Sequence, residues 1–233
     1  FVESLPSGKV PHPGIHDHFV TIDGIKYHYT EYPGPGENIV LLHGFASSTY
    51  TWEKVALRLQ AKGYHVWALD MKGFGWSDKP EDADYAPLQL LEEVNAWMEK
   101  MDLRKVVLVG NSLGGAIAWN MALLHPEKVK KLVLIDAAGF MHDIPFPVRL
   151  AGLPGAGGVA RLIFGRWMIE DTFNQVYFDP AAITEEQIDA YYDRMRTENA
   201  LGAMAAIGRS VSTLSDKEYA LRIPEIQVDT LII

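Results

Sequence analysis

The stretch KVVLVGNSLGGAIAW, residues 105–119, contains the pattern that decides the fold. Residues 105–109 form a short, continuous apolar run, which is typical of a buried strand. Residues 113–124 form a longer apolar run that ends at His125-Pro126, which indicates a helix. The G-x-S-x-G pattern of Gly110–Gly114 lies between them and predicts a sharp turn from strand to helix, with Ser112 at its tip.

The small residues of this turn have a physical reason. A serine at the tip of so sharp a turn has strained backbone angles, and the chain must pass close to it, so its neighbours must be small. Gly110 and Gly114 meet that need. The turn lifts the Ser112 hydroxyl clear of the sheet, and the helix that follows offers free N–H groups to a developing negative charge.

Strands and helices alternate on both sides of this turn. Apolar runs at 38–42, 65–70 and 131–135 predict strands, and helical spacing at 51–62 and 86–101 predicts the helices between them. Because the runs are apolar on both faces, we predict an α/β fold with a mostly parallel sheet flanked by helices. An N-terminal hairpin is predicted as well, since residues 19–22 and 25–29 flank Asp23-Gly24.

The alternation stops after Gly139. Residues 140–223 contain helical stretches but no clear strand, and Thr184 with Gln187 predicts a capped helix start. We therefore predict three parts: the first part of an α/β core (1–139), a helical cap (140–223), and a return to the core sheet that stops within a strand (224–233). We expect the apolar cap residues to pack the cap onto the sheet, some of them facing a substrate tunnel: Phe146, Leu162, Phe164, Trp167, Met168, Phe173, Tyr177 and Phe178.

Four segments together resemble the α/β-hydrolase family, and the resemblance covers nearly all of the chain from about residue 19. They are the loop Leu41–Phe45, the D-x-x-G-x-G-x-S turn Asp70–Ser77, the nucleophile elbow Gly110–Gly115 and the strand Leu132–Asp136 before the cap. The resemblance implies that Ser112 is the nucleophile. It also implies an oxyanion hole made by the backbone N–H groups of Phe45 and Leu113, which would stabilise the tetrahedral intermediate.

The residue at the elbow also discriminates within the family. Haloalkane dehalogenases and epoxide hydrolases have an aspartate there, so Ser112 argues against both. The resemblance further implies that His43 supports the oxyanion loop rather than acting as the base.

The sequence departs from the family where the base is concerned. A serine needs a general base, which an acid orients, and in this family the order is Ser, then Asp or Glu, then His. All eight histidines lie before residue 143: His12, His16, His18, His28, His43, His65, His125 and His142. We therefore expect a C-terminal segment of the same protein to supply the acid and the histidine, and we expect the chain alone to lack activity. A protein without a triad is the alternative, and Asp136, which follows a strand, stays open as an alternate acid.

Composition and charge exclude several classes of function. The 233 residues carry 21 basic and 30 acidic side chains, a net charge of −9, so nucleic acid is not an expected partner. Without cysteine there is no disulfide, cysteine-ligated zinc or thiol nucleophile. No apolar stretch approaches the ~18 residues of a membrane span. We expect a soluble protein with the cytoplasm as the preferred compartment, and a removed signal peptide or anchor before Phe1 stays open.

No metal or organic cofactor is implied. His12, His16 and His18 with Asp17 could in principle bind a metal, but an exposed histidine-rich segment is the simpler interpretation.

The predicted activity is hydrolysis of a small carboxylic ester with an apolar part, through an acyl-enzyme on Ser112. Two alternatives stay open. Gly110–Gly115 resembles the elbow of meta-cleavage hydrolases, which break a carbon–carbon bond, although His43–Ser48 lacks their Gly/Pro-rich loop. The other alternative is a non-catalytic module in which the hydrolase cavity binds a ligand.

Overall fold

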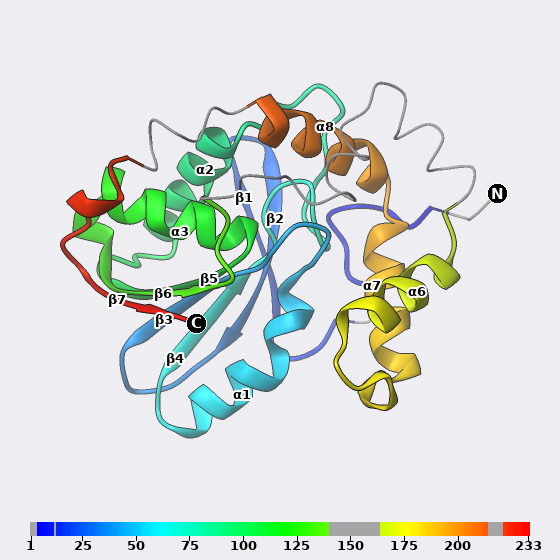
Figure 1. Ribbon diagram of the computed structural model, residues 1–233, viewed down its shortest axis with the longest axis horizontal. Coiled ribbons are helices and arrows are strands. Elements are labelled where there is room, and N and C mark those ends of the chain that lie inside the picture. Colours follow the sequence, from blue (N-terminus) through cyan, green and yellow to red (C-terminus); the bar gives the residue numbers. More distant parts are fainter. Residues whose placement is uncertain (1–3, 12, 140–163, 214–220) are drawn as a thin grey trace.

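A seven-stranded sheet lies at the centre of the computed structural model, which describes residues 4–11, 13–139, 164–213 and 221–233 (Figure 1). The strands are β1 (Asp17–Ile22), β2 (Ile25–Tyr32), β3 (Asn38–Leu42), β4 (His65–Leu69), β5 (Val106–Asn111), β6 (Val129–Ile135) and β7 (Asp229–Ile232). The helices are α1 (Glu53–Ala61), α2 (Pro87–Lys100), α3 (Leu113–Leu124), α6 (Arg166–Val176), α7 (Glu185–Met195) and α8 (Ala200–Thr213). The predicted α/β class is confirmed.

The sheet has the order β1-β2-β4-β3-β5-β6-β7, and its five strands from β4 to β7 run parallel. The predicted hairpin of β1 and β2 is present, and Asp23 and Gly24 at its turn both have positive φ, as a type I′ turn requires. Because β2 also pairs with β4 in the antiparallel direction, the hairpin extends the sheet rather than standing apart.

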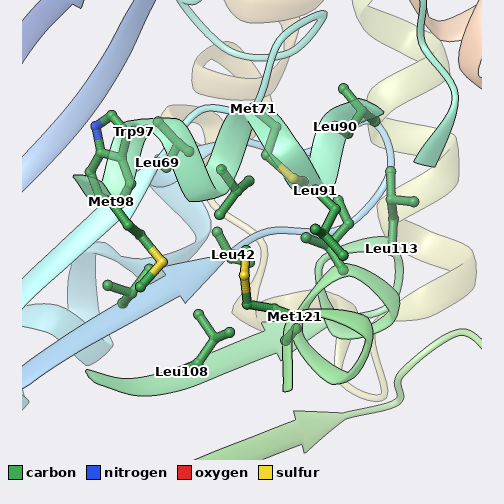
Figure 2. Close-up of a cluster of buried hydrophobic side chains, with 14 of the residues drawn as sticks. Leu42, Leu69, Met71, Leu90, Leu91, Trp97, Met98, Leu108, Leu113 and Met121 are labelled. Carbon is green, nitrogen blue, oxygen red and sulfur yellow. The ribbon is translucent and has the colours of Figure 1, made fainter. Parts of the chain in front are cut away.

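The sheet is covered on both faces, as the doubly apolar strands predict. Alternate residues of β3 point to opposite sides: Val40 and Leu42 join the cluster under α2 and α3, whereas Ile39 and Leu41 pack with Trp52 and other residues on the α1 side. Figure 2 shows part of the first cluster, between α2, α3 and the strands, with Leu113 of the elbow among its members. The elbow is therefore built on the main core.

The cap region has its own small core. Phe164, Ile169, Phe173 and Ile188 bury one another between α6 and α7, which lie to one side of the sheet (Figure 1). The expected capping box at α7 is confirmed: Gln187 N donates to Thr184 Oγ1 at 3.2 Å, and Thr184 N donates to Gln187 Oε1 at 2.9 Å. In contrast, α8 packs into the main core through Ala203, Met204 and Ile207.

The expectation that the cap aromatics pack onto the sheet is wrong for several of them. Phe164 and Phe173 fill the cap's own core, with Met168 and Tyr177 against it, while Trp167 and Phe178 are exposed. This distribution fits a helix pair that packs on itself, because the inward apolar stripe of each helix is then buried within the pair. Phe146 and Leu162 lie outside the described residues, and the boundaries 1–139, 140–223 and 224–233 stay a prediction. Within the described residues, no helix is long and apolar enough to cross a membrane.

The N-terminal segment is tied to the link between α7 and α8. Leu5 N donates to Arg196 O at 3.1 Å, and Glu198 N donates to Leu5 O at 2.7 Å. Three residues further on, Gly8 N donates to Trp76 O at 2.9 Å. Residues 5–8 therefore form a strap that joins the core to the cap helices.

Candidate active site

Three of the segments singled out in the sequence meet at one edge of the sheet. Strands β4, β3 and β5 are neighbours and parallel, so their carboxyl ends lie side by side. Asp70, His43 and Ser112 each follow the end of their strand directly. This is the edge at which open α/β sheets bind their ligands.

Ser112 has the backbone geometry predicted for the tip of a sharp turn. Its φ of +49° lies in the left-handed region, which a side chain rarely adopts without support. Its carbonyl accepts hydrogen bonds from Ala116 N and Ala138 N, each at 3.0 Å, and its N–H donates to Ile135 O at 3.1 Å. Its side chain makes no capping bond to α3, so the hydroxyl is not used to hold the helix.

The glycines around Ser112 are required by close backbone contacts. A Cβ atom on Gly110 would lie 2.3 Å from Gly114 O, and one on Gly114 would lie 2.3 Å from Leu42 O. A Cβ on Gly44 would come within 3.2 Å of the Ser112 Cβ. The loop after β3 therefore lies against the elbow.

His43 braces that loop from within the core. It is fully buried, its Nδ1 donates to Gly44 O at 2.8 Å, and its Nε2 accepts from Met71 N at 3.2 Å. Burial lowers the pKa of the imidazole below its ordinary value, with the charge of Asp70 opposing that shift only in part. Both ring nitrogens of the neutral imidazole are occupied, so His43 has none left to serve as a base.

The loop leaves two backbone donors beside Ser112. Within the described residues, the Phe45 N–H and the Leu113 N–H have no protein acceptor. These are the two amides that the resemblance assigns to the oxyanion hole. They come from different elements, the loop after β3 and the first residue of α3.

A buried charge network, not predicted from the sequence, lies behind this edge. The Asp70 carboxylate accepts from Thr49 N at 2.6 Å, from Trp76 N at 2.8 Å and from His28 Nδ1 at 2.7 Å. His28 Nε2 in turn lies 2.8 Å from Asp17 Oδ1. His28 is fully buried, and with a carboxylate at each ring nitrogen it has no free position for a base.

The electrostatics of this network follow from burial and pairing. Burial alone would lower the pKa of His28, but the charge of Asp70 and the hydrogen bonds that His28 makes to Asp17 and Asp70 outweigh it and raise the pKa. Burial would raise the pKa of Asp70, but the charge and the hydrogen bond of His28 hold it well below its ordinary value. The partners in this network could not be predicted from the sequence, because its members are far apart along the chain. Its one signal was a histidine among apolar residues of a strand.

Helix α7 contacts the same region from the cap. The Arg194 guanidinium lies over the rings of Tyr50 at 5.2 Å and Trp76 at 5.0 Å. Tyr191, one turn earlier, places its hydroxyl 3.2 Å from Ser47 Oγ. These contacts could not be predicted from the sequence, because a capping box marks where a helix starts but not which face it presents to the core.

The remaining candidates have simpler surroundings. Asp136 is exposed, and its N–H donates to Ile233 O at 3.0 Å; its role as an alternate acid stays a prediction. Of the histidines considered for a metal, His12 lies outside the described residues and His16 Nδ1 bonds to Glu31 O. Among the described residues, no three His, Asp or Glu side chains are grouped so as to hold a metal ion.

The chain is similar in sequence to hydrolases from a bacterium and from a mammal. YugF, an uncharacterised hydrolase of Bacillus subtilis (strain 168), is 32% identical over 190 residues, which cover 79% of this chain and 68% of YugF. Bifunctional epoxide hydrolase 2 of Rattus norvegicus is 35% identical over 133 residues, which cover 57% of this chain and 24% of the rat protein. The chain therefore spans about two thirds of YugF and about a quarter of the rat protein.

A solved structure of a membrane phospholipase A, a bacterial virulence factor, is 28% identical and has a TM-score of 0.71; the match covers 93% of this chain and 68% of the other. The family model of the alpha/beta hydrolase fold matches residues 37–233, which include the elbow, the loop after β3 and the helices α6, α7 and α8. With its sheet, its elbow and these relatives, the chain belongs to the α/β-hydrolase family.

Proposed function

We propose that the protein hydrolyses a carboxylic ester with an apolar part through an acyl-enzyme on Ser112. The observation that carries the proposal is a serine with φ +49° on the elbow, beside two backbone donors that have no acceptor among the described residues. In the proposed reaction, Ser112 Oγ attacks the ester carbonyl and passes its proton to a base. The Phe45 and Leu113 N–H groups then receive the oxyanion. The alcohol leaves with that proton, and water releases the acid from the serine.

Ser112 is also the reason to prefer an ester over an epoxide. The curated relatives include epoxide hydrolases, and they support a hydrolase on this scaffold. The family's epoxide hydrolases use an elbow aspartate, whose carboxylate attacks directly, whereas a serine hydroxyl suits acyl transfer. The similar phospholipase A, an ester hydrolase by name, is consistent with that preference.

We further propose that the acid and the histidine come from a segment that follows Ile233. His28 and His43 have both ring nitrogens occupied, so neither supplies a base. In the part of the chain that the structure describes, strand β7 pairs only with β6, and its Leu231 and Ile232 are 55% and 75% exposed. A parallel strand is normally buried on both faces, so this edge suits further chain of the same protein.

The test is covalent labelling of the full-length protein with a fluorophosphonate, read by intact mass and peptide mapping. We expect one adduct, on Ser112, and none in Ser112→Ala. The variant should lose nitrophenyl ester hydrolysis by a factor on the order of 10³ or more, as removal of a triad nucleophile does. A dienone substrate and an epoxide, assayed side by side, test carbon–carbon hydrolysis and epoxide opening. Ligand binding without adduct or turnover would contradict the proposal and indicate a non-catalytic module.

A further inference from the structure

The peptide group between Gly44 and Phe45 links the core to the proposed oxyanion hole. In a planar trans peptide the C=O and the N–H point in opposite directions. Gly44 O accepts from His43 Nδ1 at 2.8 Å and from Ser47 N at 3.3 Å. The groups that hold Gly44 O therefore also set the direction of the Phe45 N–H.

The two groups that hold this carbonyl are anchored in different parts of the molecule. His43 is fixed within the core by Met71 N. Ser47 is reached from the cap, because its Oγ lies 3.2 Å from the hydroxyl of Tyr191 on α7. The oxyanion loop is thus fixed at one point by the core and at another by the cap.

Tyr191 is itself firmly packed. Its ring meets Phe173 of the cap core edge-on, with centroids 4.9 Å apart, and meets Tyr50 edge-on at 6.1 Å. The Tyr50 ring also contacts the guanidinium of Arg194, which lies on α7 one turn after Tyr191. A shift of α7 would therefore move the Tyr191 hydroxyl relative to Ser47.

We propose that Tyr191 is a positioning residue for the oxyanion hole, acting through Ser47. When α7 is seated on the core, Tyr191 holds the Ser47 side chain, the Ser47 N–H holds Gly44 O, and the Phe45 N–H is aimed at the site of the oxyanion. This inference rests on the ester hydrolysis proposed above. The cap then takes part in forming the oxyanion hole. The position of α7 determines whether the Phe45 N–H is aligned beside the Leu113 N–H or whether Leu113 is the single aligned donor.

The first test is steady-state kinetics of the full-length protein with a nitrophenyl ester. Tyr191→Phe removes only the hydroxyl, and Ser47→Ala removes its partner. We expect each to lower kcat about 10-fold with KM changed less than about twofold, a fraction of the 10²–10³-fold loss caused by deleting an oxyanion donor. The double variant should be no slower than the slower single variant, because both act through one hydrogen bond. The matched control is Tyr192→Phe, the next residue of α7, whose ring stacks on Phe164; it should leave kcat and KM unchanged.

The second test does not depend on ester turnover. Hydrogen–deuterium exchange of the amides in residues 44–48 should be several-fold faster in Tyr191→Phe than in the parent or in Tyr192→Phe, at equal thermal stability. Unchanged exchange and unchanged kcat, an effect on KM alone, or additive losses in the double variant would each overturn the inference. If exchange is faster in Tyr191→Phe but the parent protein hydrolyses no ester, the contact between cap and loop is supported and the proposed function is contradicted. Normal ester turnover with no effect of Tyr191→Phe would remove the inference alone.

Discussion

Ser112 is held in an unfavourable conformation by its surroundings. A left-handed backbone at a residue other than glycine costs on the order of 1–3 kcal/mol, which the rest of the fold must offset. Here three backbone hydrogen bonds, to Ala116, Ala138 and Ile135, hold the residue in place. These hydrogen bonds keep Ser112 at the tip of the turn, and its hydroxyl makes no capping bond to α3.

The Asp17–His28–Asp70 network makes stability depend on pH. The pKa of His28 is raised in the folded protein, so its stabilising contribution is complete below the unfolded value of about 6.5 and is lost as pH rises through the folded value. Asp17→Asn removes one of the two carboxylates while keeping its shape. We expect it to destabilise the protein more at pH 6 than at pH 9, by about 1.4 kcal/mol for each pKa unit that His28 loses.

Urea unfolding at both pH values measures this difference. The matched control is Asp23→Asn at the tip of the hairpin, which changes the net charge equally and should show the same small effect at both. An equal destabilisation by Asp17→Asn at pH 6 and pH 9 would mean that His28 carries no extra proton in the folded state.

At the level of single residues, a role could be predicted from the sequence where it depends on residues that are close along the chain. Gly110, Ser112 and Gly114 could be interpreted together because the turn that needs them lies within five residues. The partners of His28 could not, since Asp17 and Asp70 reach it only after β1, β2 and β4 have paired. The roles of Ser112, Phe45 and Leu113 stay predictions until they are tested by chemistry.

Among the elements, α7 has the clearest start signal, and the consequence can be measured. Thr184→Ala removes the side-chain acceptor of the capping box, which typically costs about 1 kcal/mol of helix stability. We expect faster amide exchange in the first turns of α7, whereas Thr184→Ser, which keeps the hydroxyl, should retain the parent rate. If Thr184→Ala exchanges like the parent, the cap core rather than the capping box fixes the start of α7.

Elements were predicted well where their pattern was complete within the segment. The strands β3, β4 and β5 and the helices α1, α2 and α3 lie within a residue or two of their expected ranges. Strand β2 continues to Tyr32, past the expected 29, because β4 pairs with that end, and β6 begins at Val129 rather than 131 because Val129 pairs with Val106. These extensions depend on the neighbouring strand and not on the segment itself.

The assignment of helices to layers could not be predicted in the same way. Helix α8 lies within the predicted cap, residues 140–223, yet it packs on the main core. An amphipathic stripe predicts that one face of a helix is buried, but it does not predict which element covers that face. For the same reason, Trp167 and Phe178 were expected at the sheet and are exposed.

For the whole molecule, the edge of β7 is the feature with a measurable consequence. An exposed, apolar strand edge promotes pairing between chains, and Leu231, Ile232 and Ile233 are all more than half exposed. We expect a chain of residues 1–233 to self-associate in sedimentation velocity experiments and Ile232→Lys to reduce this. Phe178→Lys, which removes an exposed aromatic from the cap, should have no such effect. If residues 1–233 sediment as a single monomeric species, the exposed edge of β7 does not promote pairing between chains.

The strap at residues 5–8 determines how the molecule would respond to a mechanical load. Both backbone groups of Leu5 are hydrogen-bonded to the link between α7 and α8: its N–H donates to Arg196 O, and its carbonyl accepts from Glu198 N. A pull on the N-terminus therefore reaches the cap helices first, in shear, before it reaches the sheet. Helix α7, which carries Tyr191 and Arg194, ends directly before this link, so the force would act on α7 and on its contacts with Ser47 and Tyr50.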